Sequence, residues 1–164
     1  MKRHVHAVLS LYVIVIFVQS LFFKFARSPE TIYIFEEKLD PWAASLGFPG
    51  LFAPGGIFSA YVIGSFELLA SVLLLAGLVL ASRRWIQGLG ALLSMGIISG
   101  AIFFHLFTPL GVAVRNTDGT SDGGQLFMLA CGVWVASAIL VWMRRGELLA
   151  LLRPRTASGL QQPL

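Results

Sequence analysis

The chain has 164 residues, of which 57% are hydrophobic and only 12% charged, whereas a soluble domain is about 25% charged. This composition excludes an ordinary soluble protein and predicts an all-α, polytopic membrane protein of one domain. The net charge of +4 is small, and basic residues do not alternate with exposed aromatics, so we expect no nucleic-acid partner. A single cysteine, Cys131, excludes an internal disulfide, a CxxC redox pair and a cysteine-based metal site.

Four apolar stretches are long enough to cross a bilayer, which needs roughly 20 helical residues. They cover residues 5–26, 57–81, 86–107 and 125–143. Lys2 and Arg3 precede the first stretch, but no A-x-A-type cleavage site follows it, so we interpret it as a retained helix. The sequence therefore predicts a four-helix transmembrane domain over residues 1–145 and a polar, partly disordered tail over 146–164.

The connection between the first two spans, residues 27–56, is polar and amphipathic. Ser28, Pro29 and Glu30 form a helix-start pattern, with a capping serine, a proline at the first position and an acid in the first turn. The mixture of apolar and charged residues that follows predicts a short helix on the membrane surface, ended by Asp40-Pro41. Near the other terminus, residues 147–152 could continue the last helix along the surface.

Glu67 is the only charged residue of the second span. An ionised side chain inside a bilayer costs about 3 kcal/mol or more unless it has a partner. Ala60, Gly64, Glu67 and Ser71 are spaced three or four apart and share one small, polar helix face. Such a face favours contact with another helix over contact with lipid.

Lys24 ends the first span and His105 lies near the end of the third, both on the membrane side to which Glu67 is closer. If the second span starts at residue 57, Glu67 lies about 15 Å inside the membrane boundary near Lys24. A direct Lys24–Glu67 pair therefore requires the second helix to start later, near Ser59-Ala60. The candidate intramembrane polar site is therefore Lys24, Glu67 and His105. Surrounding residues that could support it are Asp122, Tyr61, Tyr12 and Gln19.

Structural alternatives exist for each member of this site. Lys24 could only extend to the outer headgroups, His105 could only cap the interface, and Glu67 could be a hydrogen-bonded or protonated packing residue. No metal-ligand spacing is visible, and one interior histidine argues against a bis-histidine haem. The Gly96-x-x-x-Gly100 pair is typical of close helix packing.

The basic residues predict the topology. Eight lie on the side of the termini and four on or near the other, which places both termini in the cytoplasm. The eight are Lys2, Arg3, Arg83, Arg84, Arg144, Arg145, Arg153 and Arg155, and the four are Lys24, Arg27, Lys38 and Arg115.

Several short motifs resemble the DoxX family of small bacterial membrane proteins. They are Phe22-Phe23-Lys24-Phe25, Gly64-x-x-Glu67-Leu68 with Leu75-Ala76-Gly77, Phe103-Phe104-His105-Leu106 with Thr108-Pro109-Leu110-Gly111, and Asp122-Gly123-Gly124-x-Leu126-Phe127. The resemblance covers most of residues 8–145. It implies a four-helix bundle in the bacterial inner membrane, with Lys24, Glu67 and His105 at the family's polar positions. The name-giving relatives are associated with thiosulfate–quinone oxidoreductase or terminal oxidase complexes. Other relatives resemble accessory proteins of redox-maturation or oxidative-stress complexes, and many have no assigned activity.

The leading functional hypothesis is an accessory or quinone-proximal subunit of a membrane redox system. Glu67 and His105 would exchange protons with a quinol, and Lys24 would stabilise an anion. One alternative is a non-enzymatic scaffold or assembly factor, whose 27–56 connection contacts a periplasmic partner. Another is a small-solute or proton pathway, which would need a homo-oligomer because the chain is too short for the inverted repeats of most transporters.

Overall fold

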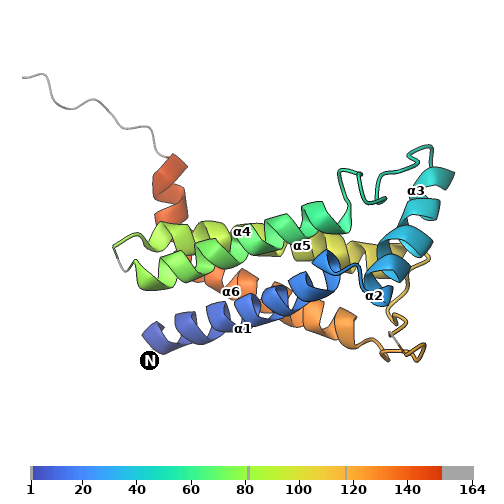
Figure 1. Ribbon diagram of the computed structural model, residues 1–164. Coiled ribbons are helices and arrows are strands. Elements are labelled where there is room, and N and C mark those ends of the chain that lie inside the picture. The colour runs from blue at the N-terminus through green and yellow to red at the C-terminus, as the bar shows by residue number, and fades with distance from the viewer. Residues whose placement is uncertain (1, 81, 117, 153–164) are drawn as a thin grey trace, which may run out of the picture.

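The computed structural model describes residues 2–80, 82–116 and 118–152 and is helical over most of them (Figure 1). Four long helices are apolar enough to cross a membrane, which confirms the predicted all-α, multi-pass bundle. The elements are α1 (Lys2–Phe25), α2 (Pro29–Ile32), the π-helix η1 (Tyr33–Leu39), α3 (Asp40–Ser45), α4 (Ala60–Val79), α5 (Arg84–Phe107) and α6 (Gln125–Leu152).

Most helix boundaries lie within three residues of the predicted ones, and two of the differences matter for the site and the tail. Helix α4 begins at Ala60 and not at Ile57, because the Ser59 side chain accepts a hydrogen bond from the Val62 N–H and caps the helix there. Helix α6 continues without interruption to Leu152. Residues 147–152 therefore continue the last helix, as the sequence allowed, and the remainder of the predicted tail, 153–164, lies outside the described residues.

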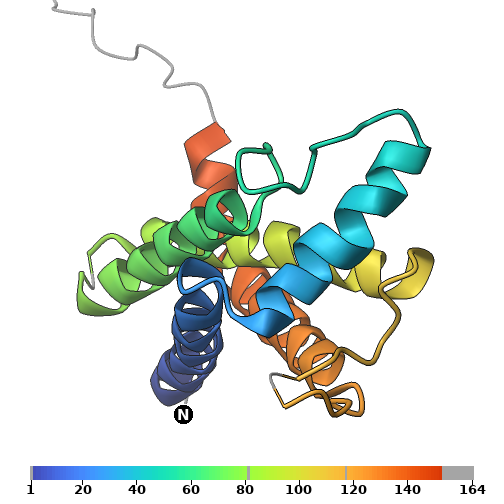
Figure 2. The same cartoon turned by 45° about the vertical axis from the view of Figure 1, so that its right-hand side comes forward.

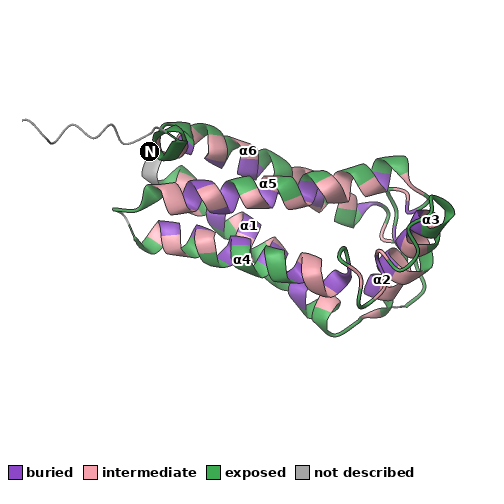
Figure 3. Cartoon of the chain, turned by 90° about the horizontal axis from the view of Figure 1, so that it is seen from above, coloured by how far each residue is buried: buried purple, intermediate pink, exposed green. Residues whose placement is uncertain are grey.

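The long helices pack in the order α1, α4, α5, α6, and α1 also contacts α6 to close the bundle. Buried residues alternate with exposed ones along each long helix (Figure 3), and the exposed ones include many large apolar residues. The main core is formed by apolar residues from all four helices: Val13, Phe17, Ala70, Leu74, Ala91, Ile98, Ala130, Val133, Ala136 and Leu140. We call the end where α1 begins and α6 ends the terminal end, and the opposite end, with α2 and α3, the loop end.

A second layer covers the loop end. Segments α2, η1 and α3 follow one another as one continuous helical rod across this end (Figure 2). Asp40-Pro41 does not end the helix, contrary to the prediction. Pro41 lies in the first turn of α3, directly after the π-helix, and proline is tolerated in the first turn of a helix.

The rod packs on a separate apolar cluster that joins it to the two loop-end connections. Phe104 from the end of α5 contacts Phe52 edge-to-face at 5.2 Å and Trp42 at 6.1 Å between ring centroids. The buried members of this cluster are Phe35, Leu39, Ala43, Phe52, Ala60, Leu110 and Val114. Because Ala60 opens α4, the loop-end layer is packed directly against the start of the helix that carries Glu67.

Glycines allow the closest helix approaches, but not the pair predicted from the sequence. A Cβ added to Gly77 would lie 2.4 Å from the Gln87 backbone nitrogen, and one added to Gly90 would lie 2.9 Å from the Leu74 nitrogen. By contrast, an added Cβ at Gly96 or Gly100 would meet nothing within 4 Å. Within this chain the Gly96–Gly100 pair therefore does not mediate close packing.

Candidate functional site

Lys24 and Glu67 form an ion pair between α1 and α4. The Lys24 Nζ donates to both carboxylate oxygens of Glu67, each at 3.0 Å, and also to the Ser20 hydroxyl one turn earlier. The side chains are 14% and 5% exposed, respectively. The buried acid of α4 therefore has the partner that its position in an apolar span demands.

The local sequence explains how these side chains meet. The later start of α4 at Ala60 brings Glu67 closer to the loop end, within reach of Lys24. Gly64, one turn before Glu67, lies under the Lys24 side chain, since a Cβ there would be 3.5 Å from the Lys24 Cδ. The predicted polar face of α4 is buried, as expected, and Ser71 donates to the Glu67 carbonyl at 2.8 Å.

His105 has a different partner. It is buried, at 8% exposure, and its Nδ1 lies 2.6 Å from the Gly111 carbonyl oxygen, to which a proton on that nitrogen would donate. Its ring also contacts Phe127 of α6 edge-to-face at 5.7 Å. This hydrogen bond therefore ties α5 to the loop that follows it. His105 is not among the described contacts of Lys24 or Glu67.

Asp122, predicted as a support for His105, instead organises the backbone before α6. Its carboxylate accepts from the N–H groups of Val114 at 2.7 Å, Gly124 at 2.9 Å and Leu126 at 3.0 Å. Burial alone would raise the pKa of Asp122, but these hydrogen bonds outweigh it and hold the pKa below its ordinary value of 3.8.

The remaining predicted supports are spread along the bundle. Tyr61 stacks on Phe25 at 6.2 Å, beside the Lys24–Glu67 pair. Gln19 is exposed on α1. Tyr12 lies twelve residues before Lys24, about 18 Å along the helix, with its hydroxyl against Gly132 of α6.

A second polar network, at the terminal end, was not predicted. The Gln87 amide of α5 is fully buried and donates to the Ser10 hydroxyl of α1 at 2.8 Å. Its carbonyl oxygen accepts from the Arg144 Nε of α6, also at 2.8 Å. Each residue is unremarkable alone. The sequence could have indicated this network only through position, because Ser10, Gln87 and Arg144 lie at a similar depth near the ends of three predicted spans.

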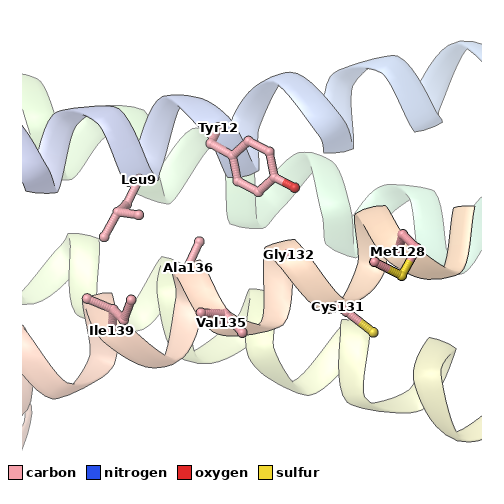
Figure 4. Close-up of a pocket in the computed structure, with 8 residues that line it drawn as sticks. All are labelled: Leu9, Tyr12, Met128, Cys131, Gly132, Val135, Ala136 and Ile139. Carbon is pink, nitrogen blue, oxygen red and sulfur yellow. The ribbon is translucent and has the colours of Figure 1, made fainter. Parts of the chain in front are cut away.

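Two pockets are described, and neither is lined by Lys24, Glu67 or His105. One is an apolar groove of about 430 Å³ between α1 and α6 (Figure 4), lined by Leu9, Tyr12, Met128, Cys131, Gly132, Val135, Ala136 and Ile139. The other, of about 370 Å³, lies at the loop end between α2, η1 and the 115–119 turn. Within the described residues, no cluster of three or more His, Cys, Asp or Glu side chains could hold a metal ion.

Comparisons with protein-family models, with curated proteins and with solved structures found no match. The membership of this chain in the DoxX family therefore stays a prediction based on the short motifs around Lys24, Glu67 and His105. Over the residues that the structure describes, the chain is a multi-pass, four-helix membrane bundle with a buried ion pair near its loop end and a buried polar network at its terminal end.

Proposed function

We propose that this chain is a non-catalytic accessory protein of the bacterial inner membrane, and that its loop end presents a contact surface to a periplasmic partner. The observation that carries the proposal is the Lys24–Glu67 pair, in which both carboxylate oxygens are taken by one ammonium group. In this role the pair fastens α1 to α4 and so fixes the position of the layer above them.

The burial and hydrogen bonding of Glu67 and His105 favour this role over proton exchange. A general acid or base must reach the proton it transfers, within about 3 Å or through one water. Glu67 is 5% exposed and paired with Lys24, while His105 is 8% exposed and bonded through its Nδ1 to the Gly111 carbonyl, not to that pair.

The loop end also exposes large apolar side chains, which supports the contact surface. Leu46 and Phe48 are 57% and 61% exposed in the connection after α3, and Ile57 is 69% exposed just before α4. We propose that these side chains contribute apolar contact area to the partner. The layer beneath them is packed on its own core, so they are presented from a fixed position.

The distribution of basic residues supports the proposed orientation, with the terminal end in the cytoplasm. Reporter fusions test it. Alkaline phosphatase inserted after Gly47 should be active, and green fluorescent protein fused at the C-terminus should be fluorescent. The reverse pattern would place the proposed contact surface in the cytoplasm and overturn the periplasmic assignment.

A photo-crosslinking experiment tests the function. A crosslinking amino acid at Phe48 should capture a protein partner in intact cells, whereas the same group at Val72, 53% exposed in mid-span, should capture none. Glu67→Ala should abolish capture, because the layer is no longer fixed. Replacing both partners, as K24M/E67L, should retain it. Loss of capture in a folded double variant would show that the charges themselves are required and would contradict a structural role.

An accessory subunit of a membrane redox system is the second candidate. The groove between α1 and α6 favours it, because it is open and its lining is apolar apart from the Tyr12 hydroxyl, which suits a lipid-soluble quinone. A quinone analogue titrated into the pure protein tests this candidate. It predicts saturable binding that Gly132→Leu removes, whereas the non-catalytic role predicts none.

A further inference from the structure

The pocket at the loop end is lined by two opposite charges that do not pair with each other. It has a volume of about 370 Å³, and its lining includes Glu37 of η1 and Arg115 of the connection before α6. Both residues are exposed, and among the ion pairs of the described chain neither has a partner. The carboxylate and the guanidinium are therefore both available to a ligand in this pocket.

The Glu37 side of the pocket belongs to the rod that crosses the loop end. Pro29, Tyr33 and Glu37 follow one another at intervals of four residues and line the pocket together, so they lie on one side of the rod. Phe35 and Leu39 are buried in the apolar cluster beneath the rod. The rod is thus anchored from below, and it holds the Glu37 carboxylate at a fixed wall of the pocket.

The Arg115 side is held in place by a closed turn and by an aromatic ring. In the turn, the Asn116 N–H donates to the Thr120 carbonyl at 2.8 Å. The Arg115 guanidinium carbon lies 5.9 Å from the centroid of the Tyr33 ring, and the Lys38 Nζ lies 5.1 Å from the same centroid. These cation–π contacts fix positive charge beside Tyr33, on the pocket that Glu37 also lines.

The charges and the depth of the pocket define the ligand. A purely anionic ligand would be repelled by Glu37 and a purely cationic one by Arg115, so a ligand that carries both charges fits best. Pro29 follows the apolar span of α1 by four residues, and Gly119 precedes that of α6 by six. The pocket therefore lies in the headgroup layer, which is about 5–8 Å deep on each side of the hydrocarbon core.

We propose that this pocket binds a phosphoethanolamine group, the zwitterion that forms the headgroup of phosphatidylethanolamine. The Arg115 guanidinium donates to the phosphate oxygens, and the primary ammonium of the ligand donates to the Glu37 carboxylate. Pro29 and Ile32 line the same pocket and offer apolar surface to the glycerol end. Basic pockets of membrane proteins bind lipid headgroups, and here Glu37 adds a preference for the ammonium.

The test is a titration of the full-length protein in neutral detergent, followed by native mass spectrometry. Phosphatidylethanolamine should bind saturably and more tightly than phosphatidylglycerol, which has no ammonium group. Arg115→Gln should weaken phosphatidylethanolamine binding about fivefold, as expected for one basic residue near a membrane surface. Glu37→Gln should weaken phosphatidylethanolamine but not phosphatidylglycerol, so the preference should disappear. Arg27→Gln is the matched control, because that guanidinium, at the same end of the bundle, is 2.7 Å from Glu36 and does not line the pocket.

Two results would overturn the proposal. Equal weakening by Arg27→Gln and Arg115→Gln would indicate diffuse surface attraction, and an unchanged preference in Glu37→Gln would show that this carboxylate does not bind the ammonium. Competition with free O-phosphoethanolamine then separates the two sources of the group. Displacement of the lipid at a concentration near the dissociation constant of the lipid would assign the site to a soluble ligand, whereas a need for a large molar excess would assign it to the phospholipid.

Discussion

Lys24 and Glu67 are 43 positions apart in the sequence, yet the Lys24 Nζ lies 3.0 Å from each oxygen of the Glu67 carboxylate. The pair joins α1 to α4 where Gly64 lets the lysine side chain lie close to the α4 backbone. Neither charge is more than 14% exposed, so each depends on the other for the solvation that water would otherwise supply.

Removing one partner of this pair should be far more harmful than removing both. Glu67→Ala leaves a buried ammonium group and should lower the free energy of unfolding by about 3 kcal/mol or more. K24M/E67L replaces the pair with apolar side chains and should cost much less. Unfolding in mixed micelles measures both. Ser65→Ala, an exposed position on the same helix, is the control, and strictly additive single and double effects would contradict the coupling.

Helix contact in this bundle depends on Gly77 and not on Gly96. Gly77→Ala places a methyl group 2.4 Å from the Gln87 backbone nitrogen and should force α4 away from α5, with a large loss of stability. Gly96→Ala meets nothing within 4 Å and replaces glycine with a better helix former, so stability should be unchanged or slightly raised. Melting temperatures of the two variants in the same detergent compare them. A loss at Gly96 as large as that at Gly77 would show that the exposed glycine packs against another molecule.

His105 should act on the loop that follows α5. His105→Ala removes the hydrogen bond to the Gly111 carbonyl and should cost about 1–3 kcal/mol, because it leaves that carbonyl without its described partner. Hydrogen exchange of the 108–116 segment should rise while exchange at the Lys24–Glu67 contact does not. Leu106→Ala, 52% exposed one residue later, is the control. Faster exchange around Glu67 would instead indicate that the three polar residues act as one site.

Asp122 should contribute stability that persists to acid pH. The pKa of its carboxyl lies below 3.8 in the folded protein, so the contribution is complete above that value and is lost only as the pH falls through the lower, folded pKa. Asp122→Asn should therefore lower the melting temperature by a constant amount from neutral pH down to about 4, and the difference should shrink in stronger acid.

Asp118 provides the control for this pH dependence. Hydrogen bonds from the Thr120 hydroxyl and N–H lower its pKa as well, but the group is fully exposed in a turn and binds no helix end. Asp118→Asn should have little effect at any pH. A stability difference for Asp122→Asn that disappeared near neutral pH would contradict the assignment.

The helices and the ion pair could be predicted from the sequence because both follow from local rules. Apolar runs of sufficient length gave four spans, and the cost of a buried acid indicated that Glu67 needs a partner. Even the start of α4 at Ala60 was available from the Ser59 capping signal. The functional role of Lys24, Glu67 and His105 remains a prediction.

The misjudged features depend on where backbones lie relative to one another. His105 binds the Gly111 carbonyl because Gly111 adopts a left-handed φ of 70°, which turns the loop back toward α5. No side-chain pattern in the sequence predicts that backbone geometry. The close glycine contacts likewise follow from which faces of α4 and α5 meet, and the Gly96–Gly100 spacing alone could not show that this face points away.

The length of α6 has a consequence for the choice of membrane. Its 28 residues extend about 42 Å, and the stretch from Gln125 to Arg144 is bounded by the Asp122 carboxylate at one end and by a guanidinium fixed to Gln87 at the other. Neither charged group can move into the acyl-chain region, so the distance between them defines the bilayer thickness that the bundle fits. In a thinner bilayer the whole bundle must tilt, and in a thicker one the surrounding lipid must compress.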